Sequence, residues 1–143
     1  MAEEQVYWDD VSEGQEISLN EPMSSQRLVM WAAASGDFYQ IHYDESFAVG
    51  TGLEGVIVHG ALKGMLAGRL LDEWTGEDGR IVRWGVSYRG MDPVGQDMRI
   101  WGKVTKKYEQ DGEGRVDLNV GATQPDGTET TPGTATVVLP KRA

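Results

Sequence analysis

The chain has 143 residues, enough for one domain of ordinary size, and 39% of them are hydrophobic, enough for a packed core. Its 13 basic and 23 acidic residues give a formal net charge of -10, which argues against binding to nucleic acid or to an anionic membrane surface. Cysteine is absent, so disulfides, thiolate nucleophiles and cysteine metal sites are excluded. The acidic N-terminus and the lack of a long apolar run predict a cytoplasmic protein without a signal peptide or membrane span.

Two helices are predicted in the first half of the chain. Ser24 can cap a short helix that ends near Gly36. A longer helix is predicted from Val58 to Trp74, where apolar residues recur at helical spacing. This second helix contains three glycines, each of which costs about 1 kcal/mol relative to alanine. We therefore expect a sheet or a ligand to approach it closely.

Strands are predicted after Gly76, where apolar and polar residues alternate. The alternating sets fall within residues 82–88, 98–104, 116–122 and 135–139, and turn-like sequences rich in Asp, Gly and Pro separate them. A further strand near residues 5–8 or 16–19 would complete the sheet. The period of two predicts antiparallel strands with one covered face. A sheet wrapped around the long helix is then the economical architecture.

The segment from Ala34 to Asp44 is the most informative for chemistry. It places Asp37 and His42 five positions apart on a loop that follows the first helix. Adding water to a conjugated thioester requires a base for the water, an acid for the α-carbon and donors for the enolate-like oxygen. Asp37 and His42 can share one water and divide the first two tasks, since histidine titrates near neutral pH. The structural alternative is a helix C-cap, a turn and a packed histidine.

The segment from Val56 to Ala61 opens the long helix and can supply the third requirement. Free N–H groups and the helix dipole favour negative charge at such an end. Gly60 has no side chain, so a ligand oxygen can approach its N–H. The alternative is that Gly60 only permits tight packing against a strand. We interpret His59 as a structural residue beside the pocket that forms a hydrogen bond or caps the helix.

Together these two segments resemble the MaoC-like dehydratase family, which includes the (R)-specific enoyl-CoA hydratases. The family motif Gly-Asp-x-Asn-Pro-(Leu/Ile/Val)-His-x-(Asp/Glu) corresponds to residues 36–44, and its later Val-His-Gly corresponds to residues 58–60. The resemblance covers about residues 12–140. It implies a single MaoC-like hot-dog domain over residues 1–143, an α+β fold in which a curved antiparallel β-sheet wraps around a long central α-helix.

The resemblance also implies an activity and an assembly. The activity is that of a hydro-lyase, an enoyl-thioester hydratase or 3-hydroxyacyl-thioester dehydratase. Asp37 and His42 would be the catalytic dyad, and the Gly60 N–H would lie in the oxyanion hole. The substrate would be carried as a thioester of CoA or acyl carrier protein, with no cofactor and no metal. The assembly would be a homodimer with sheets joined edge to edge, a higher oligomer, or a heteromer with a homologous subunit.

Two departures from the family pattern fall near the expected substrate pocket, which we predict to include Tyr39, Ile41, His59 and Gly68. Tyr39 and Gln40 replace the Asn-Pro of the motif, which puts the loop geometry in doubt and lets Tyr39 reach into the pocket. Gly68 stands where some members carry a serine that faces the site. Both changes suggest an unusual acyl group, or a subunit that has diverged from the ordinary reaction.

The same residues allow three alternatives to the hydratase. A hot-dog thioesterase commonly has a carboxylate near or on the central helix, but here the helix has no acid before Asp72. A non-catalytic acyl-CoA-binding partner of a catalytic homologue would keep Asp37 and His42 for structure only. A metal site built from both histidines with Asp37 and Asp44 is chemically conceivable, although nothing in their spacing demands it.

A thioester of CoA or of a carrier protein implies contacts to phosphate. The basic residues that are candidates for these contacts are Lys63, Arg69, Arg80, Arg83, Arg89, Lys103, Lys106 and Lys107. Charges at alternating strand positions usually form a solvated face, so the sequence favours none of them.

Overall fold

A computed structural model describes residues 4–143 and shows five strands, three α-helices and two short 3-10 helices in that range. The elements in chain order are η1 (Trp8–Asp10), β1 (Glu16–Pro22), α1 (Ser25–Ser35), η2 (Gln40–His42), α2 (Glu45–Gly50), α3 (Gly60–Thr75), β2 (Arg80–Val86), β3 (Asp97–Gln110), β4 (Glu113–Thr123) and β5 (Glu129–Leu139).

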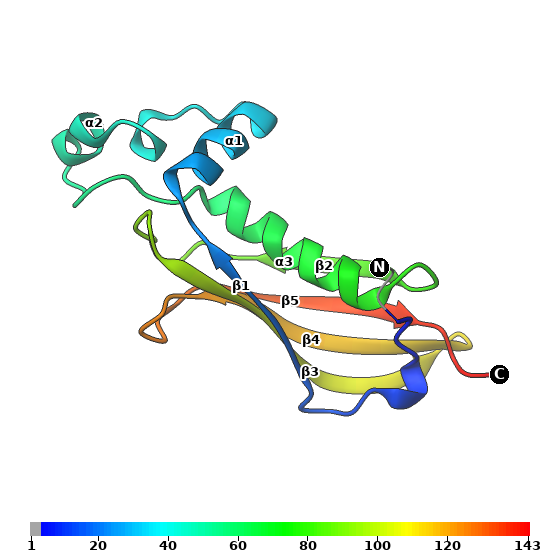
Figure 1. Cartoon of the computed structure of the whole chain (residues 1–143). Helices are drawn as coiled ribbons and strands as arrows, with labels where there is room; N and C mark the ends of the chain where they lie inside the picture. Colours follow the sequence, from blue (N-terminus) through cyan, green and yellow to red (C-terminus); the bar gives the residue numbers. More distant parts are fainter. Residues whose placement is uncertain (1–3) are drawn as a thin grey trace.

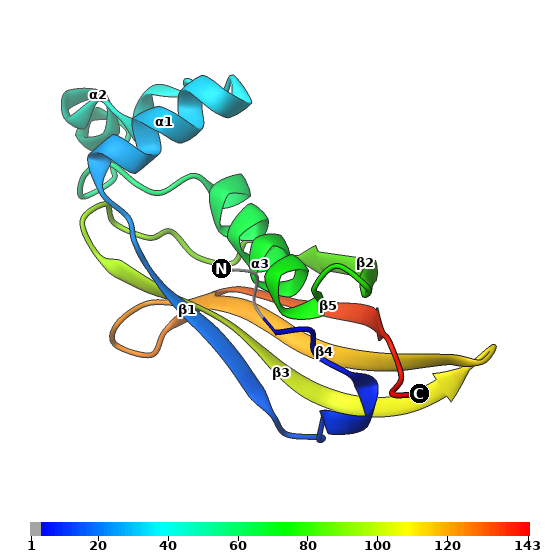
Figure 2. The same cartoon turned by 45° about the vertical axis from the view of Figure 1, so that its right-hand side comes forward.

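The five strands form one antiparallel sheet in the order β1-β3-β4-β5-β2. The sheet curves beneath α3, which lies along one of its faces (Figures 1 and 2). Helices α1 and α2 lie together at the end where α3 begins. The predicted α+β architecture, a curved antiparallel sheet around one long helix, is therefore confirmed.

The apolar side of α3 forms the core with the covered face of the sheet. Leu62, Leu66 and Leu70 recur every four residues and pack in one buried cluster with Ile100 of β3 and Ala122 of β4. This spacing places side chains on a single face of a helix. A second cluster joins Leu71 to buried residues of β3, β4 and β5. Since one face of α3 is fixed by this packing, the orientation of its other faces is fixed as well.

The caps of α1 are those that the sequence predicts. The Ser24 side chain accepts a hydrogen bond from the Arg27 N–H at 3.2 Å. At the other end Gly36 adopts a left-handed conformation with φ 79°, and its N–H donates to the Ala32 carbonyl at 2.9 Å. Glycine takes this conformation without the steric cost of a Cβ. The chain therefore leaves α1 at a defined angle, directly before Asp37.

The structure differs from the sequence prediction in several elements. Of the two ranges suggested for the first strand, 16–19 lies in β1, whereas residues 5–7 have no regular structure. Helix α2 and both 3-10 helices were not predicted. Helix α3 starts at Gly60 rather than at Val58, because the Val58 N–H donates to the Asp92 carbonyl at 2.8 Å and keeps this segment extended. Among residues 4–143, no helix has the length and apolar character needed to cross a membrane.

Strand β2 also departs from the expected pattern of one covered face. It pairs with β5 along one side and forms an edge of the sheet. A register shift between Ile81 and Arg83 interrupts its pairing. Val82 and Trp84 remain 44% and 39% exposed. Alternation along β2 was therefore a poor guide to burial, because Val82 falls at the register shift and Trp84, although its ring contacts Gly68 of α3, lies on an edge strand.

Candidate active site

The loop between α1 and α2 brings Asp37 and His42 together. One carboxylate oxygen of Asp37, Oδ1, accepts a hydrogen bond from the Tyr39 N–H at 3.3 Å, which closes a turn. The 3-10 helix η2 then carries His42 back toward the other oxygen. The distance from His42 Nε2 to Asp37 Oδ2 is 4.0 Å, longer than a hydrogen bond. Two polar groups at this separation can both contact one small molecule such as water.

The orientation of His42 is fixed by the chain segment that leads into α3. His42 Nδ1 lies 2.8 Å from the Ile57 carbonyl oxygen. A carbonyl can only accept, so Nδ1 carries the proton in this bond. Nε2 of the neutral ring is then an unprotonated base that faces Asp37. The Ile57 N–H donates to the Ile41 carbonyl at 3.1 Å, so both backbone groups of Ile57 hold the loop that bears His42.

His59 lies directly beneath this pair and is fully buried. Its ring stacks on that of His42, with centroids 3.9 Å apart and planes inclined by 22°. His59 Nε2 lies 3.2 Å from the backbone carbonyl of Asp37, to which it can only donate. Burial, reinforced by the neighbouring His42, lowers the pKa of His59. His59 is therefore a neutral residue that contacts both the His42 ring and the Asp37 backbone. Although it occupies the N-cap position of α3, its side chain does not cap the helix.

The first turn of α3 opens beside His42. Its N–H groups have no acceptor within the helix, and the helix dipole places partial positive charge there. His42, Gly60, Lys63 and Tyr88 line one pocket of about 320 Å³. A Cβ at Gly60 would lie 3.2 Å from the Tyr88 ring. The absence of a side chain at Gly60 thus lets an aromatic ring approach, while its N–H end stays next to the dyad.

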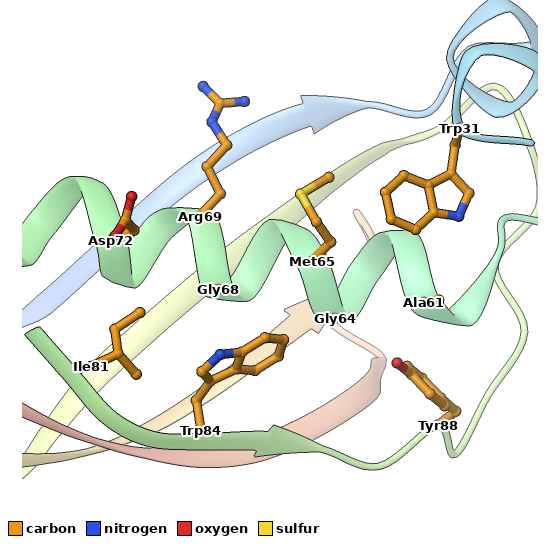
Figure 3. Close-up of a pocket in the computed structure, with 10 residues that line it drawn as sticks. All are labelled: Trp31, Ala61, Gly64, Met65, Gly68, Arg69, Asp72, Ile81, Trp84 and Tyr88. Atoms are coloured by element: carbon orange, nitrogen blue, oxygen red, sulfur yellow. The ribbon is translucent and has the colours of Figure 1, made fainter. Parts of the chain in front are cut away.

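A larger pocket of about 540 Å³ runs along the glycine face of α3 (Figure 3). Trp31, Trp84 and Tyr88 form aromatic walls, and Gly64 and Gly68 form the helix side. A Cβ at Gly68 would lie 2.9 Å from the Trp84 ring, and one at Gly64 would lie 2.8 Å from the Tyr88 hydroxyl. The glycines of α3 therefore make room for rings that come from β2 and the segment after it.

The remaining residues predicted for the pocket lie in different places. Gly68 lines the large pocket, whereas His59 is buried below His42. Tyr39 is exposed, and its ring packs edge to face against His42 and Phe47. Ile41 is half-buried, and its carbonyl holds Ile57.

Tyr88 is a site residue that the sequence does not predict, and Lys63 lies in an environment other than the predicted one. Lys63 was a candidate for phosphate contact, but its ammonium group is buried in an ion pair with Asp92. It is therefore not available to a phosphate in this structure. No local signal marks either residue, because their positions depend on packing between α3 and residues far along the chain.

Side-chain atoms of Asp37, His42 and His59 lie within 4.8 Å of one another, a spacing that can suit a metal ion. The hydrogen bonds limit which atoms are free. His42 Nδ1 and His59 Nε2 are held by backbone carbonyls. The two rings are stacked and nearly parallel, so their in-plane lone pairs do not converge on one point as a metal site requires. The arrangement suits proton transfer better than metal binding.

The fold and the position of this site define a class of protein, the hot-dog α+β domain with an acid and a histidine at the entrance to its central helix. Residues 10–125 match the family described as MaoC like domain. The chain belongs to this family. No curated protein matches the sequence.

Solved structures of similar fold include hydratases. An (R)-hydratase from A. caviae involved in PHA biosynthesis is 26% identical, with 92% of this chain and 98% of that chain covered and a TM-score of 0.82. R-hydratase PhaJ1 from Pseudomonas aeruginosa is 21% identical over 96% of this chain and 88% of that chain, with a TM-score of 0.80. The ChsH1-ChsH2 complex from Mycobacterium tuberculosis is 21% identical over 90% of this chain and 98% of the matched chain, with a TM-score of 0.77.

The lowered pKa of His59 predicts that stability falls in mild acid. Between the lowered pKa and the ordinary value of about 6.5, the unfolded chain binds a proton that the folded chain excludes. The free energy of unfolding should therefore decrease as the pH falls below about 6.5. Urea denaturation at pH 7.5 and pH 5.5 measures this decrease. His59→Gln should show a smaller pH dependence than the unaltered protein, and an equal decrease in both would contradict the assignment to His59.

Proposed function

We propose that this protein is an enoyl-thioester hydratase that also catalyses the reverse dehydration of 3-hydroxyacyl thioesters. The observation that carries the proposal is the geometry of His42. In the neutral ring, the bond to the Ile57 carbonyl places the proton on Nδ1, so the lone pair is on Nε2, which faces Asp37 Oδ2 at 4.0 Å. Membership of the MaoC like family and the likeness to an (R)-hydratase support the same reaction.

In the proposed reaction, a water bound between Asp37 and His42 attacks the β-carbon of the enoyl group. One of the two side chains takes a proton from this water as the C–O bond forms. The electron pair of the double bond moves toward the thioester carbonyl, whose oxygen becomes negatively charged. The N–H of Gly60 and the dipole of α3 stabilise that charge. The dyad then delivers a proton to the α-carbon, so that the elements of one water are added and the protein is regenerated.

Substitution of either member of the dyad should nearly abolish turnover. Asp37→Asn and His42→Gln should each lower kcat by at least about a hundredfold, the usual scale of general acid–base catalysis, with the circular dichroism spectrum unchanged. The assay follows the loss of enoyl absorbance from crotonyl-CoA and longer enoyl-CoAs, with chiral analysis for the (R)-3-hydroxyacyl product. Asp78→Asn, an exposed substitution of the same kind on the turn before β2, is the matched control.

Each other outcome of this assay points to another function. Near-normal turnover in either dyad variant contradicts their assignment as catalytic residues. Release of free thiol by the unaltered protein indicates a thioesterase instead of a hydratase. Absence of turnover on every enoyl thioester, with thioester binding retained, indicates a non-catalytic partner subunit.

We further propose that the acyl group occupies the pocket along α3. Gly60 lines the smaller pocket together with His42, and the next residue, Ala61, lines the larger one, while Tyr88 borders both. A thioester with its oxygen at Gly60 can therefore extend its acyl chain past Tyr88 toward Trp84 and Gly68. Arg69 and Asp72 also line this pocket, but most of its walls are apolar and aromatic, as expected for binding an acyl group rather than the polar CoA.

A side chain at Gly68 should restrict the protein to substrates with shorter acyl chains. In Gly68→Val, the new Cβ meets the Trp84 ring, and the methyl groups fill the pocket. We expect kcat/KM for enoyl-CoAs of eight or more carbons to fall at least about tenfold, on the scale of one or two misfitted methylenes. The value for crotonyl-CoA should change less than about threefold. Gly50→Ala in α2, where a Cβ meets no atom within 4 Å, is the control, and an equal loss for all chain lengths would contradict this pocket.

We also propose that two copies join through β2 into a homodimer. The outer side of β2 lacks a strand partner in the described chain, and Val82, at the register shift of this strand, is exposed. The opposite edge strand, β1, is protected by exposed Glu16 and Asn20 and ends at Pro22. Charged residues and proline are typical of edges that do not pair.

Light scattering after size-exclusion chromatography should give about twice the chain mass of 15.7 kDa. Val82→Glu places a charge on the exposed side of the β2 edge and should shift the protein toward the monomer. Ser18→Glu, at an exposed position on β1, should leave the dimer intact. A monomeric unaltered protein would contradict the homodimer, and a search for a homologous partner chain would follow.

A further inference from the structure

Lys63 is a buried cation that the proposed chemistry does not use. It lies one helical turn after Gly60, and the residue is only 1% exposed. Its ammonium group pairs with Asp92, which is fully buried, and also donates to the Gly90 carbonyl at 3.3 Å. A lysine is almost never buried without a partner, so this side chain is held by specific contacts rather than by general packing.

Asp92 is itself held by side chains from the β4–β5 turn and the start of β5. The Thr130 hydroxyl donates to its Oδ1 at 2.8 Å, and the Gln124 side chain donates to the same oxygen at 3.0 Å. Gln124 also donates to the Met91 carbonyl at 3.1 Å. The pair therefore ties the first turns of α3 to the segment of residues 90–94 and to the turn between β4 and β5.

The segment of residues 90–94 in turn pairs with residues 56–58, which enter α3. The Val58 N–H donates to the Asp92 carbonyl at 2.8 Å, and the Val94 N–H donates to the Val56 carbonyl at 3.1 Å. Between these two bonds, Ile57 and Pro93 form an isolated β-bridge. The position of Asp92 therefore sets the position of the backbone on either side of Ile57.

Ile57 connects this segment to His42 through its two backbone groups. Its carbonyl accepts the Nδ1–H of His42, and its N–H donates to Ile41 in the same 3-10 helix. Three residues later the same segment presents the Gly60 N–H at the start of α3. Hydrogen bonds thus link the Lys63–Asp92 pair to the segment that holds the base, and the backbone of this segment continues into the oxyanion donor.

We infer that Lys63 and Asp92 are positioning residues of the hydratase: their ion pair fixes the segment of residues 56–58 and with it the tautomer of His42 and the N-terminus of α3. The inference rests on the proposed function. Stability alone does not account for the pair, because well-packed apolar residues in place of a buried ion pair are often as stable or more stable. Here the pair supplies directional bonds between the first turns of α3, the segment of residues 90–94 and the turn between β4 and β5.

The test separates positioning from stability by removing both charges together. Lys63→Met and Asp92→Leu each leave one buried charged group without its partner and should destabilise the fold. The double variant leaves neither. We expect it to melt close to the unaltered protein, while kcat for crotonyl-CoA falls at least about tenfold, as a small misplacement of catalytic groups does, and KM changes less than about threefold. Asp92→Asn is the milder variant and should show a smaller fall in kcat.

A second readout does not depend on activity. The chain has two histidines, so the ring nitrogens of His42 can be followed by nitrogen-15 NMR and assigned with a His42→Gln sample. The unaltered protein should show His42 protonated at Nδ1. The double variant should show a mixture of the two tautomers, because the Ile57 carbonyl is no longer held in place.

The outcomes decide between the two proposals. Unchanged kcat in the double variant overturns the positioning role, whatever its stability. If the unaltered protein has no hydratase activity, the proposed function fails, and the tautomer measurement then decides alone. Nδ1 protonation of His42 that is the same in the unaltered protein, in Asp92→Asn and in the double variant overturns the inference.

Discussion

The hydrogen bond between His42 Nδ1 and the Ile57 carbonyl is the constraint on which the site depends. It decides which ring nitrogen is protonated, and it aims the other nitrogen at Asp37. A backbone carbonyl serves this purpose well because it cannot donate, so the opposite tautomer would lose the bond. The histidine is thus oriented by the chain trace and not by a second acidic side chain. Any change that moves Ile57 changes the chemistry of His42.

The same constraint explains why α3 begins where it does. Residues 56–58 must stay extended to pair with residues 92–94, so the helix cannot start at Val58 even though the helical pattern of apolar residues extends to it. Gly60 is then the first helical residue, and its N–H lies at the free end of the helix dipole. The extended entry segment therefore fixes two features at once, the tautomer of His42 and the location of the positive helix end.

The parts of the fold that could be predicted are those with local causes. Ser24 and Gly36 act as helix caps through contacts within a few residues, and β3 and β4 follow the alternation of buried side chains. The N-terminal end of α3 and the exposure of β2 depend on pairing between distant segments, so periodicity alone placed them incorrectly. The edge position of β2 follows from strand order, which a single sequence does not contain.

In the candidate site, too, the residues with local sequence signals could be predicted and those placed by tertiary packing could not. Asp37, His42 and Gly60 could be singled out because a loop after a helix and a glycine at a helix start are visible in the sequence, and the family motif joins them. The stack of His42 on His59 and the burial of Lys63 against Asp92 could not, because each joins residues brought together by tertiary packing. Lys63 is the clearest example. It is a charged residue in a helix, and its charge alone suggested an exposed side chain that contacts phosphate, whereas it is buried against Asp92.

The replacement of Asn-Pro by Tyr39 and Gln40 can now be explained physically. Proline would restrict the loop by fixing a backbone angle, but here the loop is closed in another way. Asp37 Oδ1 accepts the Tyr39 N–H, and the His42 N–H donates to the Tyr39 carbonyl at 3.0 Å. The loop therefore keeps the acid and the histidine close without proline, and the Tyr39 ring packs against the edge of His42 instead. The departure from the family motif lies in the surroundings of the histidine, while Asp37 and His42 still face each other.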